Sequence, residues 1–177
     1  MRAISTIPLL LLLCITLCSC PYSSIYTLDD GPTVYVEDVL IGKWATLVKM
    51  PNSDKVEPVK MILSKKTDTE YNIAFLGYTD ELRPYHVVTD DSIKGTAFMS
   101  IINTKQFLNV KINSEVYIAE LRYKDNKISL YPLVEHFTAK MIHDNIGLRN
   151  SVDFHYKTRV HPMVDEDFCL IDMVRVN

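Results

Sequence analysis

The sequence predicts a mainly β domain, in which an antiparallel meander closes into a barrel or sandwich and one or two short helices lie in the C-terminal third. Turn-forming residues recur from Gly42 onward at intervals of about ten residues, the spacing of consecutive antiparallel strands. Between the turns, apolar and polar residues alternate, as in strands that bury one face. The composition, 47% apolar and 23% charged, excludes disordered, collagen-like and polytopic membrane classes.

The first 19 residues are typical of a secretory signal. Arg2 supplies a positive charge, and the apolar run IPLLLLLCITL follows from Ile7 to Leu17. This run is too short to cross a bilayer, because a spanning helix needs roughly 20 apolar residues. The alternative is a short buried helix, but the run lacks polar positions at helical spacing. We therefore expect residues 1–19 to be a signal peptide.

The end of this segment, Leu17-Cys18-Ser19-Cys20, resembles the bacterial lipobox. Leu17 stands three residues before Cys20, and the small Ser19 directly precedes it. The resemblance implies cleavage after Ser19 and lipidation of Cys20, with acyl chains such as palmitate that anchor the protein stably. Pro21 stands where an inner-membrane retention signal would have Asp, which implies the outer membrane of a diderm bacterium. An ordinary signal peptidase site is the alternative.

Removing the signal leaves a single domain without a disulfide. Of the four cysteines, only Cys169 remains beyond the predicted lipidation site, and its apolar surroundings predict an inert core residue. Residues 20–35 are polar and contain Gly and Pro, which predicts a lipidated tether. Residues 36–177 are expected to form one β-barrel-like domain.

The clearest predicted hairpin begins at Tyr117. Every second residue from Tyr117 to Tyr123 is apolar or aromatic, Glu120 and Arg122 fall on the other face, and Asp125-Asn126 turns the chain. The same alternation predicts strands around residues 59–63 and 71–75, and the run 168–176 predicts the closing strand. The other turn candidates are Pro51-Asn52-Ser53-Asp54, Lys66-Thr67-Asp68, Gly77-Tyr78-Thr79-Asp80, Thr89-Asp90-Asp91-Ser92, Asn103-Thr104-Lys105 and Asn113-Ser114.

The C-terminal third is less regular. Apolar residues four apart predict short helices near 137–145 and 151–159, the second with Asn150 or Ser151 as its N-cap. The second segment also shows apolar residues two apart, so a strand is the alternative there.

Gly42-Lys43-Trp44 opens the first predicted barrel strand, and Trp44 is the only tryptophan. The triplet resembles the Gly-x-Trp motif of lipocalins, in which the indole plugs the closed end of the barrel and an Arg of the last strand packs over it. The resemblance implies a lipocalin-like barrel in which Gly42, Trp44 and Arg175 close one end. The alternative is that Trp44 is an ordinary core residue.

No segment of the sequence carries a recognisable chemistry. The five histidines (His86, His136, His143, His155 and His161) have no metal-ligand spacing, so we expect no metal site. No nucleophile motif or phosphate-binding glycine loop occurs, so we expect no catalytic residue and no cofactor. The net charge of −3 and the absence of a basic stripe exclude nucleic acid as a partner.

These observations lead to a non-enzymatic envelope lipoprotein as the expected function. It would be attached to the membrane by its N-terminal lipid and would bind a small apolar ligand or lipid in its barrel. The alternative is a lipid-anchored protein-interaction domain with a packed core, an assembly factor or inhibitor acting on an envelope protein. An enzyme with acidic or histidine residues drawn from several strands is a third hypothesis. A pocket would favour the first, and a filled core with an exposed apolar patch the second.

Overall fold

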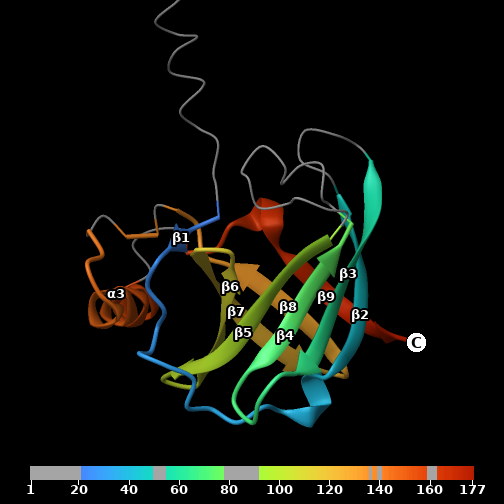
Figure 1. Ribbon diagram of the computed structural model, residues 1–177. Helices are drawn as coiled ribbons and strands as arrows, with labels where there is room; N and C mark the ends of the chain where they lie inside the picture. Colours follow the sequence, from blue (N-terminus) through green and yellow to red (C-terminus); the bar gives the residue numbers. More distant parts are fainter. Residues whose placement is uncertain (1–20, 50–54, 78–91, 136, 139–140, 159–162) are drawn as a thin grey trace, which may run out of the picture.

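The computed structural model describes residues 21–49, 55–77, 92–135, 137–138, 141–158 and 163–177 (Figure 1). The predicted signal peptide, the lipobox with Cys20, and the turn candidates at 51–54, 78–80 and 89–91 lie outside these residues. The described residues form nine strands, the helix α3 and two short 3-10 turns.

Eight of the strands form a closed antiparallel barrel. They are β2 (Gly42–Lys49), β3 (Val56–Lys65), β4 (Tyr71–Leu76), β5 (Ser92–Ile102), β6 (Lys105–Ile112), β7 (Glu115–Lys124), β8 (Lys127–Pro132) and β9 (Leu170–Val176). Each strand pairs with the next along the chain, and β9 pairs back onto β2, with Arg175 opposite Trp44. The predicted mainly β meander is confirmed, and the β9–β2 pairing shows that it closes as a lipocalin-like barrel.

The hairpin turns use Asn and Asp at positions where the backbone is left-handed. Asp125 and Asn126, between β7 and β8, have φ of 52° and 58°, which a type I′ turn requires at both central positions. Asn103 and Asn113 each have φ of 55° in the turns before and after β6. Asn and Asp tolerate this conformation better than most residues. The turns predicted at these positions are therefore confirmed.

The alternation predicted in β7 is present in the barrel wall. Ala119 and Leu121 belong to the main core cluster inside the barrel, and the partly buried Tyr117 and Tyr123 pack against it. Glu120, on the other face, is buried outside the barrel, where it bonds to Tyr156 of the C-terminal helix.

Trp44 closes one end of the barrel. Its side chain is fully buried, and its indole Nε1 donates a hydrogen bond to the carbonyl oxygen of Leu40 over 2.9 Å. Leu40 is the last residue of η2 (Asp38–Leu40), which lies across this end. The guanidinium of Arg175 lies over the indole, 4.6 Å from the ring centroid, a cation–π contact.

Arg175 also fastens the chain that enters β2. Its two terminal nitrogens donate to the carbonyl oxygens of Val39 and Ile41, over 2.6 and 2.7 Å. Gly42 has φ of +148°, and a Cβ there would lie 2.8 Å from Nη1 of Arg175, so a side chain would disturb this contact. Gly42, Trp44 and Arg175 thus meet at the closed end, in the arrangement that the lipocalin resemblance implies.

A second core lies outside the barrel, beneath α3 (Asn145–Thr158) (Figure 1). Leu148 and Val152 on the helix are fully buried against a cluster that includes Phe107 of β6 and Ile118 of β7. The rings of Phe107 and Tyr156 meet edge to face, with centroids 5.8 Å apart. Apolar residues four apart therefore bury one helix face on the barrel wall.

Of the two helices that the sequence predicted, the second is confirmed over residues 151–158, although α3 starts six residues before residue 151, and the first is absent from the described residues. The helix α3 begins at Asn145, and the described residues between 137 and 144 contain no helix. The N-cap is Asp144, whose Oδ1 accepts a hydrogen bond from the backbone N–H of Gly147 over 2.6 Å, while Asn150 and Ser151 lie inside the helix. The strand alternative for this segment is wrong.

Residues 21–35, expected as a tether, are docked against the barrel. The short strand β1 (Ser23–Ser24) pairs with β7, and the backbone N–H of Tyr22 donates to the carbonyl oxygen of Leu133 over 2.7 Å. Leu28 is 1% exposed, and its backbone N–H donates to Oδ1 of Asn109 over 2.8 Å. The segment is therefore part of the folded domain, because Leu28 is buried and the backbone N–H groups of Tyr22 and Leu28 have hydrogen-bond acceptors there.

Candidate ligand-binding cavity

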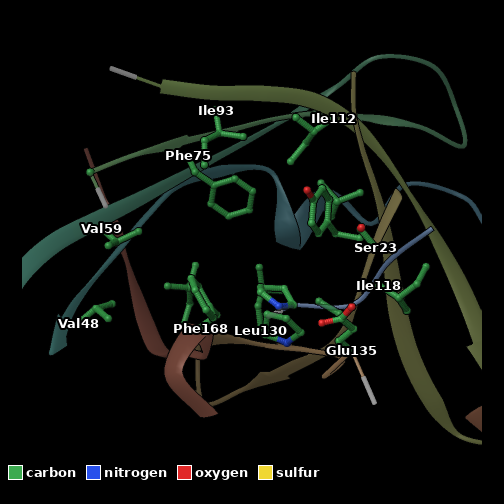
Figure 2. A pocket seen from close by; sticks show the side chains of 17 residues that line it. Ser23, Val48, Val59, Phe75, Ile93, Ile112, Ile118, Leu130, Glu135 and Phe168 are labelled. Carbon is green, nitrogen blue, oxygen red and sulfur yellow. The ribbon is translucent and has the colours of Figure 1, made fainter. Parts of the chain in front are cut away.

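The barrel is hollow at the end opposite Trp44. A cavity of about 370 Å³ lies there, where β2, β4, β6 and β8 end and the other barrel strands begin (Figure 2). This volume falls in the lower part of the range of about 300–1,000 Å³ for small-molecule pockets. Most of its lining is aliphatic or aromatic: Val48, Val59, Phe75, Ile93, Val110, Ile112, Ala119, Leu130, Phe168 and Leu170.

The two ends of the barrel are filled to different degrees. Trp44, Tyr71 and Met61 are fully buried and fill the closed end. The other end, which we call the mouth, is lined by the small Val110 and Ala119 together with the larger Phe75 and Phe168. An eight-stranded barrel is just wide enough to be filled by side chains or to hold one small ligand. Trp44 and its neighbours therefore fill one end, whereas the side chains at the other end leave a hollow.

Polar groups are confined to one side of the cavity. Figure 2 shows Ser23 and Glu135 together on that side, away from Val48 and Val59. The same two residues line a second hollow of about 330 Å³, formed with Tyr22, Ser24, Ile25, Tyr26, Thr138 and Ile142. The cavity and this second hollow, which we call the outer hollow, therefore adjoin at Ser23 and Glu135.

Tyr117 adds a hydroxyl group to the lining of the cavity. Burial raises the pKa of its phenol, and the negative charge of the nearby Glu115 raises it further. Tyr117 therefore remains neutral at physiological pH and contributes a hydrogen-bonding group without charge.

The most deeply buried acidic group near α3 does not face the cavity. Glu120 bonds to Nε of Arg122 over 2.7 Å and to the hydroxyl of Tyr156, and Nζ of Lys105 lies 3.4 Å away. Burial alone would raise the pKa of Glu120, but these hydrogen bonds and positive charges outweigh it and hold the pKa below its usual value. The group is fully partnered and links α3 to the barrel.

The predicted absence of a metal site rested on the spacing of the histidines. His143 is exposed, His155 is buried in α3, and His86, His136 and His161 lie outside the described residues. In the described part of the chain, no three His, Cys, Asp or Glu side chains gather as a possible metal-ligand set.

Cys169 is half-buried, and not the core residue that the sequence predicted. Its thiol lies 3.2 Å from the carbonyl oxygen of Asp165 and donates to it. Cys169 directly precedes β9 and follows η4 (Glu166–Phe168), so it lies at the rim of the barrel and not within it.

The sequence identified part of the cavity and missed its polar side. The alternation in β7 put Tyr117 and Ala119 on one apolar face of the strand, and both line the cavity. Pro21, Ser23 and Glu135 were missed, because they lie outside the regular strands of the barrel. Their positions depend on how the N-terminal segment docks beside β7, and no periodic signal in the sequence marks that docking.

Comparisons of the chain with protein-family models, curated proteins and solved structures find no match. Among the described residues, no helix has the length and apolar character needed to span a membrane. The function is therefore inferred from the barrel, its cavity and the sequence motifs.

Proposed function

We propose that this protein is a non-enzymatic lipoprotein of the bacterial cell envelope that binds a small apolar ligand or lipid inside its barrel. The cavity of about 370 Å³ at the mouth of the barrel is the observation that carries the proposal. Its apolar lining suits a ligand that gains roughly 25 cal/mol for each Å² of apolar surface removed from water. The cavity lies within a closed barrel in which each strand pairs with its neighbours.

Lipidation of Cys20 is the second part of the proposal, supported by the lipobox. Pro21, the next residue, lines the cavity, and β1 holds this part of the chain against β7. A lipid on Cys20 would therefore keep the mouth of the barrel close to the bilayer, which we propose is the outer membrane. Radiolabelled palmitate should be incorporated in an exporting diderm bacterium, and Cys20→Ala should abolish incorporation while Cys18→Ala retains it. Labelling of Cys20→Ala would refute lipidation at this residue.

The cavity is tested by filling it. Ala119 is buried and lines the cavity, whereas Ala45 lies on the outer face of β2, opposite Val174 of β9. The full chain should bind the apolar dye N-phenylnaphthylamine with a rise in fluorescence, Ala119→Phe should lose this binding, and Ala45→Phe should keep it. Val110→Phe fills the cavity from a second position and should also lose binding, so that the test does not depend on the folding of Ala119→Phe alone. Wild-type binding by both filling variants would contradict the proposal.

One observation favours the second candidate, a protein-interaction domain. Leu47, Val56 and Val174 are 70%, 54% and 47% exposed on neighbouring strands β2, β3 and β9. The register pairs Leu47 with Pro58 and Ala45 with Val174, which places these residues on one outer face. Dye binding that survives filling of the cavity and is lost in Leu47→Asp would assign the activity to this face.

A further inference from the structure

The cavity and the outer hollow together provide the apolar and the polar environment that the two parts of an amphiphile need. The cavity is lined almost entirely by apolar side chains, whereas the outer hollow has hydroxyl groups and a carboxylate. Ser23 and Glu135 line both, so a ligand chain in the cavity would end beside them (Figure 2).

We propose that the ligand is a single-chain amphiphile whose apolar chain fills the cavity and whose amine headgroup lies in the outer hollow against Glu135. This inference rests on the proposed binding function and specifies the ligand class.

The charge of the lining selects the headgroup. Glu135 is the one charged side chain among the described residues that line either hollow. An ionised carboxylate only accepts hydrogen bonds, so it needs a headgroup that donates them. A protonated amine donates up to three and carries the complementary charge. A fatty-acid carboxylate or a phosphate would meet like charge there and no described basic partner.

The hydroxyl groups around Glu135 fit the same headgroup. Ser23, on the strand that pairs with β7, faces both hollows, and its hydroxyl can accept a second hydrogen bond from an amine. Oγ of Ser24 already accepts from the backbone N–H of Tyr26 over 2.8 Å, so it is committed to the local turn. Ser23 and Glu135 therefore form the acceptor pair of the site.

The size of the cavity limits the volume of the apolar part of the ligand. A volume of about 370 Å³ is at the lower end for small-molecule pockets, which suits one chain and not the two of a diacyl lipid. The small residues Ala119 and Val110 provide the space, and the packed end at Trp44 sets its depth.

Three ligands with one chain and different headgroups test the assignment. Dodecylamine, dodecanol and dodecanoate would each displace N-phenylnaphthylamine from the full chain, purified from an exporting bacterium, at neutral pH and low salt. Because Glu135 is exposed, each charge effect is modest. We expect dodecylamine to bind about fivefold more tightly than dodecanol, and dodecanoate about fivefold more weakly. Added salt should reduce both differences.

Two variants distinguish the effect of the Glu135 charge from that of the net charge of the protein. Glu135→Gln should bring the three affinities together. Asp68→Asn removes one negative charge from the β3–β4 turn, at the other end of the barrel, and should leave the order unchanged. Dodecanoate binding as tightly as dodecylamine, or an unchanged order in Glu135→Gln, would overturn the headgroup assignment alone. Failure of all three compounds to displace the dye, or failure of the dye to bind, would overturn the proposed function with it.

Discussion

The buried carboxylate of Glu120 joins α3 to the barrel, and we expect Glu120→Gln to lower the free energy of unfolding by about 2 kcal/mol at neutral pH. The Glu120 side chain is 2% exposed and bonds to Arg122 and to the hydroxyl of Tyr156. Gln keeps only one acceptor oxygen, so one charge-assisted hydrogen bond is lost, worth about 1.5–3 kcal/mol. The side chains of Arg122 and Lys105 are 50% and 44% exposed, so their ion pairs add less than about 1 kcal/mol.

The effect should depend on pH with a definite sign. The pKa of Glu120 in the folded protein lies below its ordinary value of 4.5. A carboxylate with a lowered pKa contributes stability above the unfolded value, and this contribution is lost as the pH falls through the folded value. The difference between wild type and Glu120→Gln should therefore be constant above about pH 5 and disappear in more acidic solution. Urea denaturation followed by circular dichroism across this range measures it.

A double-mutant cycle with Tyr156→Phe isolates the interaction with the helix. The coupling between the two sites should be about 1–2 kcal/mol at neutral pH and vanish in acid. Glu166→Gln, at an exposed carboxylate in η4, serves as the charge-matched control and should leave stability unchanged. Equal stability of wild type and Glu120→Gln at neutral pH, or a difference that persists in acid, would show that the Glu120 carboxylate does not stabilise the contact with α3.

Three further experiments test other parts of the structure. Arg175→Ala removes the guanidinium from Trp44 and should lower the free energy of unfolding by about 2 kcal/mol and shift the Trp44 emission to the red, whereas an unshifted emission would contradict the stacking. Asn109→Ala leaves the backbone N–H of Leu28 without its acceptor and should cost about 3 kcal/mol; proteolysis near residue 28 should accelerate, and unchanged resistance would mean that the segment is held elsewhere. In vesicles of bromine-labelled phospholipid, the indole introduced by Leu47→Trp near the mouth should be quenched. The indole introduced by Tyr35→Trp, in the exposed segment that leads to the closed end, should not be quenched. Equal quenching of the two indoles would contradict a mouth that faces the bilayer.

The strands of the barrel were predictable because their signals are local. Alternation in β7 reports directly which side chains face inward, and Asp125-Asn126 marks a turn through its own backbone preference. The stacking of Arg175 on Trp44 joins distant parts of the chain, and the sequence indicated it only through the lipocalin resemblance.

The remaining features depend on contacts that no local pattern contains. Residues 21–35 have the composition of a tether. Leu28 is nevertheless buried, and its backbone N–H donates to Asn109, a contact that exists only when this segment lies against the folded β6. The start of α3 is set by Asp144 together with burial of Leu148 on the barrel. The volume of the cavity depends on the sizes of side chains that all eight barrel strands contribute. Its polar side brings together Ser23 and Glu135, which are far apart in the sequence.

We propose that the mouth of the barrel holds a small apolar or amphiphilic molecule. Native mass spectrometry of the full chain, purified from an exporting bacterium and compared with the denatured mass, tests it most directly. We expect a bound mass of a few hundred daltons that denaturation releases and that Ala119→Phe lacks. The same bound mass on Ala119→Phe, or an unliganded wild-type protein that also fails to take up added dodecylamine, would contradict ligand binding in the cavity.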